Sequence, residues 1–339
     1  MSRIAVLGSG AWGTALALSL AAQRRHTITL WSHHPETSRV LQQDRENRHY
    51  LPGIPFPDNL FLTASESDAA DAADWILCAI PSEFLRAAFT RFAPLLGSNH
   101  ILISATKGIE SGTGLRMSSV IHDCLLSQQK DIPVGALSGP SFALEVAQAQ
   151  PTAITVAFSQ IDIAMRAQQE LSSDSLRAYT SDDLVGVELG GALKNVIAIA
   201  TGIATGLGLG HNSTAALITR GIAEITRLAV AAGGRRETLA GLSGTGDLIL
   251  TCTGALSRNR SVGIELGKGR KLPDILAAMN GKVAEGVRTT KAAIDLAQKL
   301  QIDMPITQQM SAILAGNKDP RLAMRELMQR PARHEQDVC

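Results

Sequence analysis

The chain has 339 residues, and because single domains usually contain about 100 to 200 residues, this length indicates two domains. The formal net charge of +1, without a long run of one sign, argues against a nucleic-acid-binding protein, and the 45% share of hydrophobic residues argues against extensive disorder. Four cysteines, Cys78, Cys124, Cys252 and Cys339, lack both C-x-x-C spacing and a nearby histidine cluster. We therefore expect neither a metal site nor disulfides, and a reducing cytoplasm fits best.

The sequence gives no indication of export or membrane insertion. The N-terminus runs from Arg3 directly into an apolar segment without the pattern of a signal peptide. The longest apolar stretch, residues 196–210, is rich in glycine and shorter than the roughly 18 residues that suggest a membrane span. We expect this stretch to form a buried helix followed by a loop, in a cytoplasmic protein.

The first half of the chain alternates between strand-like runs and helical patterns, two of which cover residues 12–23 and 83–96. The strand-like runs are residues 3–8, 27–31, 74–80, 100–104, 134–138 and 153–158. This alternation is typical of a mostly parallel sheet covered by helices. Residues 47–60 interrupt it with three prolines, so we expect an extended loop over one edge of the sheet, a candidate lid.

The strand signal ends near residue 183. From there to about residue 328 the chain consists of helical segments rich in Ala, Leu and Gly, which predicts an all-helical second domain. The polar tail, residues 330–339, has no periodicity and is expected to be frayed. The expected domains are therefore residues 1–182, with the sheet, and residues 183–339, with the helices and the tail.

Gly8, Gly10 and Gly13 form a G-x-G-x-x-G pattern between an apolar strand-like run and a helical one. In a dinucleotide-binding turn the first glycine allows the tight turn, the second lets the pyrophosphate approach, and the third lets the helix pack closely. The anion lies at the helix N-terminus, where free N–H groups and the helix dipole favour negative charge. The predicted fold class is thus α/β, an N-terminal Rossmann-type domain followed by an all-helical C-terminal domain.

The end of the second strand bears on the choice of cofactor. Dinucleotide folds that prefer NAD usually carry Asp or Glu about 20 residues after the glycines, to bind the ribose 2′-hydroxyl. This chain has Ser32, His33 and His34 there, with Glu36 slightly beyond. Hydrogen-bond donors and partial positive charge favour a 2′-phosphate, so we expect NADP(H) to be preferred and NAD(H) to be possible. For His34, a solvated loop residue is an equally good interpretation.

Lys194 lies within an apolar run, where Gly190, Gly191 and Ala198 share its face of the predicted helix. Two glycines inside a helix cost about 1 kcal/mol each relative to alanine, so they indicate a requirement for close packing or for access. An unpaired buried ammonium would be costly, and a partner or an anionic ligand is therefore expected. Taken alone, the pattern also fits a lysine that snorkels at a helix end.

Further motifs carry polar residues in turns or next to predicted strands and helices. Lys107 follows a predicted strand, at the sheet edge where ligands bind in open α/β folds, and Ser141 follows a Gly-Pro turn and opens a predicted helix. Asp247 lies in a Gly/Thr turn, residues 257–259 gather donors suited to a phosphate, and Glu285 lies in a glycine-bounded turn. Singly, each of these is more typical of a surface loop than of a site.

Together these segments resemble the NAD(P)-dependent glycerol-3-phosphate dehydrogenase family, in its bacterial biosynthetic form, over nearly the whole chain. The matching motifs, in family order, are GSGAWGTALA, SATKGIE, SGPSFA, LGGALKNVIAIATG, GTGDLILTC, SRNR and VAEGV. The resemblance implies reduction of dihydroxyacetone phosphate to sn-glycerol 3-phosphate, a precursor of glycerophospholipids. It also implies a homodimer of two-domain chains with the active site in the cleft between the domains.

The resemblance also assigns roles to individual residues. Lys194 matches the catalytic acid/base, with Asp247 and Lys107 as further catalytic residues that also bind substrate. The other expected substrate contacts are Gly139, Ser141, Asn195, Ser257, Arg258 and Asn259. The cofactor contacts expected from the resemblance are Ala11, Trp12, His33, Lys107, Ala143, Arg258, Val283 and Glu285, in addition to the three glycines and His34.

Two other functions remain open at this point. The chain could be another reductase with a Rossmann-type and a helical domain that acts on a β-hydroxy acid, in which case SRNR would bind a carboxylate. It could also be a redox sensor that binds NADP(H) without turnover, although Lys107, Lys194 and Asp247 would then have no evident use. Trp12 and the histidines stand where some relatives carry another aromatic residue and an arginine, so the strength of the NADP preference is open.

Overall fold

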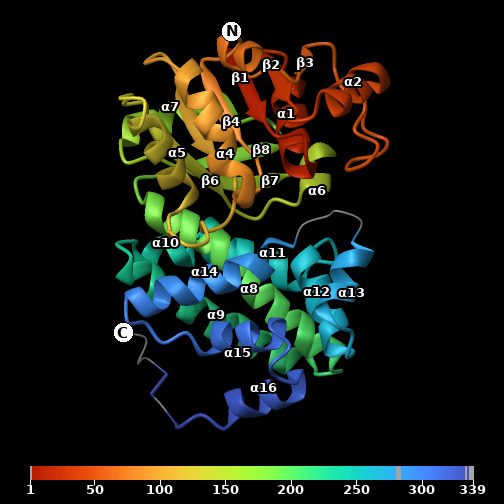
Figure 1. The fold of residues 1–339 in the computed structure, drawn as a ribbon, viewed down its shortest axis with the longest axis vertical. Helices are drawn as coiled ribbons and strands as arrows, with labels where there is room; N and C mark the ends of the chain where they lie inside the picture. Colours follow the sequence, from red (N-terminus) through yellow and green to blue (C-terminus); the bar gives the residue numbers. More distant parts are fainter. Residues whose placement is uncertain (1, 280–283, 333, 336–339) are drawn as a thin grey trace. The chain divides into compact units, whose positions relative to one another are not determined.

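The computed structural model describes residues 2–279, 284–332 and 334–335. The chain divides into two compact units (Figure 1). The first, called the sheet unit below, comprises Met1–Lys107 and Met117–Leu184, and the second, called the helical unit, comprises Gly108–Arg116 and Val185–Cys339. The short segment 108–116 joins the helical unit, where Ile109 packs in the hydrophobic core.

The sheet unit contains one sheet of eight strands in the order β3-β2-β1-β4-β5-β6-β7-β8. Its strands are β1 (Ser2–Leu7), β2 (His26–Trp31), β3 (Leu60–Thr63), β4 (Trp75–Cys78), β5 (Ile101–Ser104), β6 (Val134–Ser138), β7 (Thr152–Ala157) and β8 (Leu176–Ser181). All neighbouring strands are parallel except β6 and β7, which are antiparallel. The predicted mostly parallel sheet is confirmed, and so is each of the six predicted strands, within a few residues.

Two strands were not predicted, and both lie at the edges of the sheet. β3 begins at Leu60, which the sequence analysis assigned to the proline-rich loop, and β8 carries exposed Arg177 and Tyr179 in alternation with buried residues. An edge strand has one neighbour and can expose polar side chains, so β8 lacks the continuous apolar run on which the prediction relied. β3 is apolar but only four residues long, and it begins at the last residue of the proline-rich segment.

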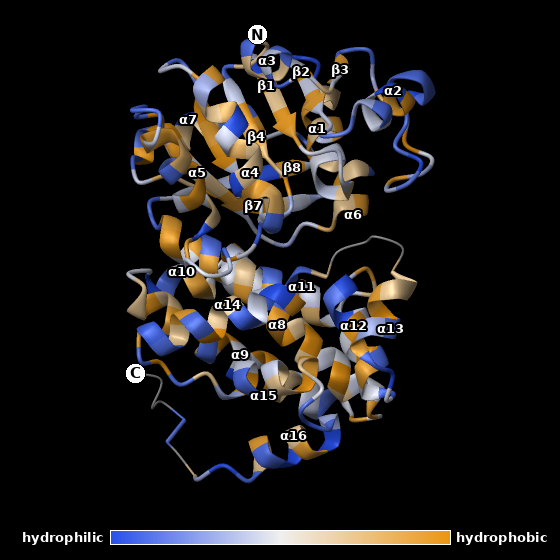
Figure 2. Ribbon diagram, in the orientation of Figure 1, coloured by the Kyte–Doolittle hydropathy of each residue, from blue (hydrophilic) through white to orange (hydrophobic). Residues whose placement is uncertain are grey.

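Helices cover the sheet on both faces: α1 (Ala11–Ala22), α2 (Pro35–Asp44), α3 (Glu66–Asp71), α4 (Ser82–Phe92), α5 (Met117–Leu126), α6 (Ala143–Ala147) and α7 (Ile161–Leu171), with a 3-10 turn, η1 (Ala93–Leu95). α1, α6 and α7 share a core with Ile4 and Val6 of β1, whereas α3, α4 and α5 contact one another. The strands between these layers are strongly apolar (Figure 2). The C-terminal ends of β1 and β2 are followed directly by the glycine turn and by His33.

The helical unit consists of α8 (Leu184–Gly206), α9 (His211–Ala231), α10 (Arg236–Ala240), a π-helical turn η2 (Leu242–Gly246), α11 (Asp247–Thr253), α12 (Arg258–Gly267), α13 (Leu272–Ala278), α14 (Glu285–Lys299), α15 (Pro305–Leu314) and α16 (Pro320–Met328). Its described residues form no strand, apart from an isolated bridge between Ile109 and Arg116. This confirms the predicted all-helical region. Of the tail expected to be frayed, residues 333 and 336–339 lie outside the described part of the chain.

α8 is the central helix of the helical unit, and every residue from Gly186 to Ala204 is buried. It is long and apolar enough to cross a membrane by composition, but 89% of its most apolar window is buried inside the structure, as in the core helix of a folded domain. The expected buried helix within residues 196–210 is confirmed, with a loop from Leu207 to Gly210.

Candidate functional site

The three glycines of the first turn have different surroundings. Gly8 has a φ of 111°, and a Cβ there would lie 2.8 Å from the carbonyl oxygen of Ala79. A Cβ on Gly13 would overlap the Gly8 carbonyl, whereas a Cβ on Gly10 would have no heavy atom within 4 Å. Gly8 and Gly13 thus serve the turn and its packing, and Gly10 leaves open space at the start of α1, where the first N–H groups have no partner within the helix. This arrangement fits the pyrophosphate of a dinucleotide.

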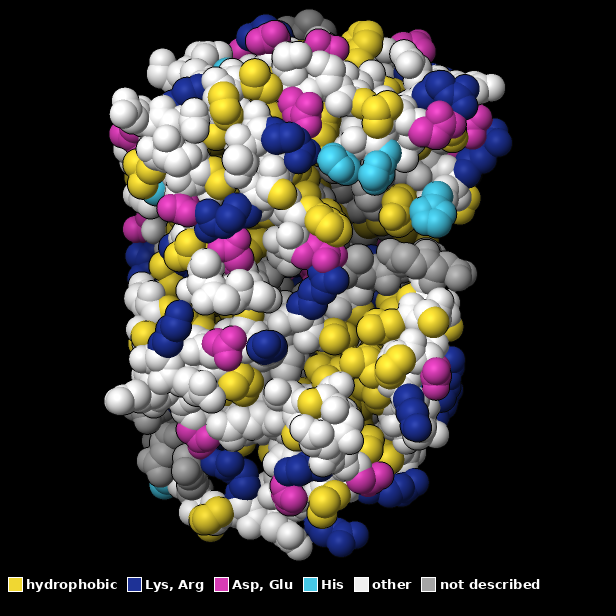
Figure 3. Space-filling view, viewed as in Figure 1, with side chains coloured by type: hydrophobic (Ala, Val, Ile, Leu, Met, Phe, Trp, Pro, Cys, Tyr) yellow, Lys and Arg dark blue, Asp and Glu magenta, His cyan; other side chains and the backbone are white. Residues whose placement is uncertain are grey.

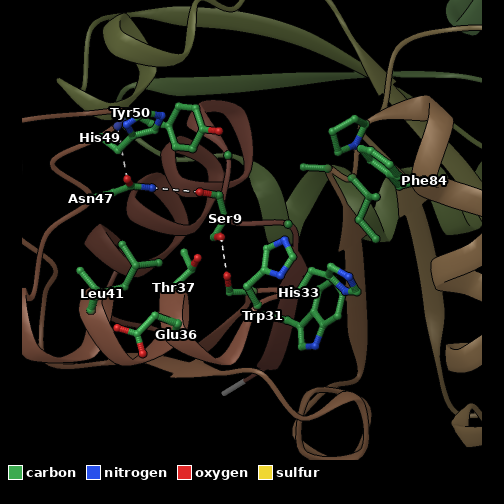
Figure 4. Close-up of a pocket in the computed structure, with 18 of the residues that line it drawn as sticks. Ser9, Trp31, His33, Glu36, Thr37, Leu41, Asn47, His49, Tyr50 and Phe84 are labelled. Atoms are coloured by element: carbon green, nitrogen blue, oxygen red, sulfur yellow. Dashed lines mark hydrogen bonds between the residues drawn. The ribbon is translucent and has the colours of Figure 1, made fainter. Parts of the chain in front are cut away.

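A pocket of about 790 Å³ opens beside this turn. It is lined by the end of β2, by α2, by the loop that follows α2 and by α4 (Figure 4). The rings of His33 and His34 lie edge to face at a centroid distance of 4.7 Å, and the ring of Trp31 lies 5.9 Å from that of His33. Histidine side chains also gather on the face near α2 in the space-filling view (Figure 3). The structure therefore places both predicted histidines in one pocket with Gly8 and Gly10.

The proline-rich loop is tied to the glycine turn by Asn47, which the sequence analysis did not single out. Asn47 is 3% exposed, and its Nδ2 donates to the carbonyl of Ser9 at 2.9 Å (Figure 4) and to the hydroxyl of Thr14 at 2.8 Å. At the same turn the hydroxyls of Ser9 and Ser32 are 2.8 Å apart. Arg45 fixes the far side of the loop by donating to the carbonyl of Pro57 at 2.6 Å. These bonds make the loop a fixed wall of the pocket in this structure.

Two arginines lie near Glu36 and His33, and neither was predicted; the pocket is also lined by Arg48, which pairs with Asp44. Arg39 donates two hydrogen bonds to Glu36, at 3.0 and 2.6 Å, and so holds the pKa of that carboxyl below its usual range. Arg91, in the last turn of α4, lines the pocket and contacts His33. Neither arginine lies in a motif, so no signal in the sequence marked them.

Two of the expected cofactor contacts, Trp12 and Ala143, come from different helices and pack against the same core cluster. α1, which also carries Ala11, contacts α6, which begins at Ala143. The indole Nε1 of Trp12 is buried and has no hydrogen-bond partner among the described residues. A buried donor of this kind is unusual, and a ligand acceptor would satisfy it.

Lys107, Gly139 and Ser141 lie together in the sheet unit. The Nζ of Lys107 is 3.4 Å from the carbonyl oxygen of Gly139, and the hydroxyl of Ser141 donates to the same carbonyl at 3.0 Å. The prediction that Ser141 opens a helix is wrong: Phe142 is the N-cap of α6, which starts at Ala143. The Ser141 hydroxyl is instead held by the turn at Gly139, whose φ is 137°.

In the helical unit, Lys194 forms an ion pair with Asp247 at the start of α11. Lys194 is 7% exposed and Asp247 is fully buried, so the pair is removed from water. A Cβ on Gly190 would lie 2.6 Å from the carbonyl oxygen of Ser243, in the π-helical turn that leads into Asp247. Gly190 therefore admits a neighbouring segment of the protein. Asp247, expected in a turn, is the first residue of a helix.

A second polar chain runs beside this pair. The Oδ1 of Asn195 accepts from the Nδ2 of Asn259 at 2.9 Å, and the Oδ1 of Asn259 accepts from the backbone N–H of Gly286 at 2.9 Å. The chain connects α8, α12 and α14, and Asn195 follows Lys194 directly in the sequence.

The remaining predicted residues lie at helix starts. Ser257 is the N-cap of α12 and accepts from the backbone N–H of Arg260, while Arg258, the first residue of α12, is exposed. Glu285, expected in a turn, is the first residue of α14, and Val283 lies outside the described residues.

Cys252 lies in α11, the helix that begins at Asp247. Burial raises the pKa of its thiol to about 12, so this cysteine stays protonated.

Comparisons with known proteins agree over the whole chain. The family model for the N-terminus of NAD-dependent glycerol-3-phosphate dehydrogenase matches residues 3–164, and the model for its C-terminus matches residues 183–325. The chain is 58% identical to a glycerol-3-phosphate dehydrogenase (NAD(P)+) of Acidobacterium capsulatum, over 99% of this chain and 100% of the relative, and 55% identical to one of Koribacter versatilis, over 99% of each. The crystal structure of glycerol-3-phosphate dehydrogenase from Coxiella burnetii superposes with a TM-score of 0.91 at 40% identity, covering 97% of this chain and 99% of that one.

Proposed function

Because the chain belongs to the NAD-dependent glycerol-3-phosphate dehydrogenase family, we propose that it reduces dihydroxyacetone phosphate to sn-glycerol 3-phosphate with a reduced nicotinamide dinucleotide. The observation that carries the proposal is the buried Lys194–Asp247 pair, an ammonium group held on a crowded helix beside a carboxylate. Full-length similarity to named dehydrogenases favours this reaction over a β-hydroxy-acid reductase and over a sensor without turnover.

In this proposal the two halves of the chain bind different molecules. Residues 1–182 bind the dinucleotide through the glycine turn, Ala11, Trp12 and the pocket beside His33, with Lys107 and Ala143 at the same end of the sheet. Residues 183–339 bind the phosphorylated ketone through the polar groups around Lys194. This proposal is supported by the open space at Gly10 and by the buried donor of Trp12.

In the proposed mechanism Lys194 is the proton donor. The nicotinamide, when bound, supplies the hydride that reduces the ketone, and negative charge then grows on the carbonyl oxygen. Lys194 gives a proton from Nζ to that oxygen, a contribution typically of about 10² to 10⁴ in rate. Asp247 keeps the buried amine in its ammonium form and fixes its position.

Other residues of the chain bind and orient the substrate. Arg258 and the start of α12 offer positive charge and N–H groups to the phosphate, and Asn259 is held in place by Asn195 and Gly286. Lys107, beside Gly139 and Ser141, adds positive charge for the developing oxyanion. Binding energy from the phosphate, which does not react, helps to fix the carbonyl for reduction. Glu285 and Arg258 are further cofactor contacts in this proposal.

We propose that NADP(H) is preferred over NAD(H), with both accepted. His33 and His34 lie in the pocket, and the acidic residue nearest the end of β2, Glu36, is already bound by Arg39. We also propose a cytoplasmic homodimer that supplies sn-glycerol 3-phosphate for glycerophospholipid synthesis, as the family resemblance implies.

The test is loss of NADPH absorbance on addition of dihydroxyacetone phosphate to the purified protein, with Lys194→Met as the diagnostic variant. We expect Lys194→Met to lose at least about 10²-fold in kcat, because the proton donor is gone, while it still binds nucleotide. Lys268→Met, which removes an exposed lysine of the same unit, should retain full turnover. Near-normal turnover by Lys194→Met would reject its role, and no turnover by unsubstituted protein that binds NADPH would reject the reaction.

A further inference from the structure

The geometry points to Arg91 and His33 as a joint binding site for the 2′-phosphate of NADP(H). Arg91 is then the residue of α4 that determines cofactor specificity, in addition to the histidines at the end of β2. This inference rests on the proposed function, because it concerns the nucleotide pocket of the sheet unit.

Arg91 is held at the pocket from two sides. Its Nε donates to the Oε1 of Glu66 at 2.9 Å, and its Nη1 donates to the carbonyl of Ala87, one turn back in α4, at 3.3 Å. Its Nη2 lies 3.3 Å from the Nδ1 of His33. The guanidinium is thus fixed by α3 and by its own helix before any ligand arrives, which reduces the entropy lost on binding.

The guanidinium keeps donors for a ligand. An arginine has five N–H groups in a planar fork, and the three bonds just described use one on each nitrogen. Among the described residues, one N–H on Nη1 and one on Nη2 are left for an acceptor. This is the geometry that binds two oxygens of one phosphate, and it is why arginine is favoured over lysine for phosphate recognition.

The contact with Arg91 also sets the tautomer of His33. A guanidinium can only donate, so the Nδ1 of His33 must accept, and the proton of the neutral ring lies on Nε2. The Nε2–H is then a donor for the same phosphate. Ring contacts with Trp31 and His34 limit the rotation of the His33 ring. Arg91 therefore acts both as a direct contact and as the group that orients His33.

The acidic residues near Arg91 and His33 do not reverse the preference of this site for a 2′-phosphate. The two oxygens of Glu36 each accept a hydrogen bond from Arg39, through its Nε and Nη2, so a positive charge stands beside the acidic residue nearest the end of β2. Glu66 contacts Arg91 only through Nε, and the side chains of both are partly exposed, at 30% and 43%, so water screens the attraction between them. The hydrogen bond to Glu66 uses Nε and leaves Nη1 and Nη2 of Arg91 outside this bond to the carboxylate.

The test measures binding of two fragments by calorimetry, without turnover: 2′,5′-ADP, which carries the 2′-phosphate, and 5′-AMP, which lacks it. We expect Arg91→Met to weaken 2′,5′-ADP binding at least about tenfold and to change 5′-AMP binding less than about twofold, because it removes charged hydrogen bonds to the 2′-phosphate alone. Arg91→Lys, which keeps the charge and loses the fork, should fall between. Arg86→Met is the matched control, since Arg86 lies on the same helix, pairs with Asp123 and does not line the pocket.

Each other outcome is decisive. Equal weakening of both fragments in a folded Arg91→Met protein, or no weakening of either, would overturn the inference. So would equal affinity of the unsubstituted protein for 2′,5′-ADP and 5′-AMP, which would leave NAD-linked reduction intact. Failure of the unsubstituted protein to bind either fragment or NADPH would overturn the proposed function as well. If Arg91→Met does not fold, Arg91→Lys and the ¹⁵N signals of the His33 ring, which report its tautomer, carry the test.

Discussion

The Lys194–Asp247 pair is a buried ion pair, and such pairs are seldom retained for stability alone. Removing two charges from water costs several kcal/mol per ion, and their attraction repays this cost only in part. Well-packed apolar residues of similar volume are often as stable or more so. We therefore expect the helical unit to be less stable with this ion pair than with an apolar pair of similar volume. A stability cost of this kind agrees with a catalytic role for the pair.

This argument predicts how substitutions affect stability. Asp247→Ala should lower the free energy of unfolding by about 3–5 kcal/mol, because the buried Lys194 ammonium loses the carboxylate that pairs with it. The double variant Lys194→Met with Asp247→Leu should regain most of that loss and still have no activity. Urea unfolding followed by circular dichroism at 222 nm measures both, since this signal is dominated by helices.

The matched control is Glu265→Ala, which breaks the partly exposed pairs with Lys268 and Arg270 and should have a much smaller effect. An Asp247→Ala protein as stable as the unsubstituted one would contradict the argument.

The sequence predicted that Lys194 needs a partner, since a buried charge requires one, and Asp247 was among the candidates. Arg91 and Asn47 could not be predicted in the same way. Arg91 contacts a residue 58 positions away, and Asn47 contacts one 38 positions away. Both contacts depend on how separate elements of the sheet unit pack, and neither residue lies in an apolar pattern or a motif that would mark it.

Helices α8 and α12 pack against each other at a contact to which each helix contributes glycines. A Cβ on Gly202 of α8 would overlap the Arg260 carbonyl of α12 and lie 2.9 Å from the Cα of Gly263. One turn on, Gly206 and Gly267 repeat the arrangement. The two backbones are therefore in direct contact, which brings the start of α12, with Asn259, against the segment of α8 that carries Asn195.

Gly202→Ala tests this contact, and the sign of its effect is informative. On helix propensity alone, alanine inside a helix should stabilise by about 1 kcal/mol. We expect a net loss of about 1–3 kcal/mol instead, because the methyl group must push α12 away. The KM for dihydroxyacetone phosphate should rise more than the Kd for NADPH, since α12 carries Arg258 and Asn259.

Gly210→Ala is the control, because a Cβ there would meet no heavy atom within 4 Å and the backbone has a φ of −80°. If Gly202→Ala were as active and as stable as Gly210→Ala, the helix contact would have no part in holding the site.

The general fold was predictable because its signals are local. Six strands with mostly buried side chains stand out as apolar runs, and the glycine turn follows from spacing. The edge strand β8 was missed because its exposed polar side chains break the pattern, and β3 because its four residues begin within the proline-rich segment. The antiparallel pairing of β6 with β7 has no local signal. For the loop at residues 47–60, the sequence showed only that it is rich in proline. Its fixed position depends on hydrogen bonds from the side chains of Asn47 and Arg45.

The stability of the sheet unit should depend on pH through His26, at the start of β2. This side chain is 2% exposed, and its Nε2 donates to the carbonyl of Glu170 at 3.2 Å. Burial lowers the pKa of His26 from its ordinary value of 6.5, and the Glu170 carboxylate, 3.6 Å from Nδ1, opposes this shift only in part. The folded protein thus favours the neutral ring.

The sign of the effect follows from proton binding. Well above pH 6.5 both the folded and the unfolded chain hold a neutral His26, and the contribution of this group to stability is fully present. As the pH falls below 6.5, the unfolded chain binds a proton that the folded chain does not, so the free energy of unfolding decreases. The decrease is at most about 1.4 kcal/mol per pH unit and ends below the folded pKa.

Tryptophan fluorescence during urea unfolding, between pH 8 and pH 5, measures this effect in the sheet unit alone, because Trp12, Trp31 and Trp75 all lie there. His26→Gln, which keeps a donor for the Glu170 carbonyl, should remove this part of the pH dependence. Glu170→Gln should enlarge it, because the carboxylate that raises the pKa of His26 is gone and the ring resists protonation more strongly. If the unsubstituted protein and His26→Gln lose stability in parallel as the pH falls, burial of His26 is not the cause.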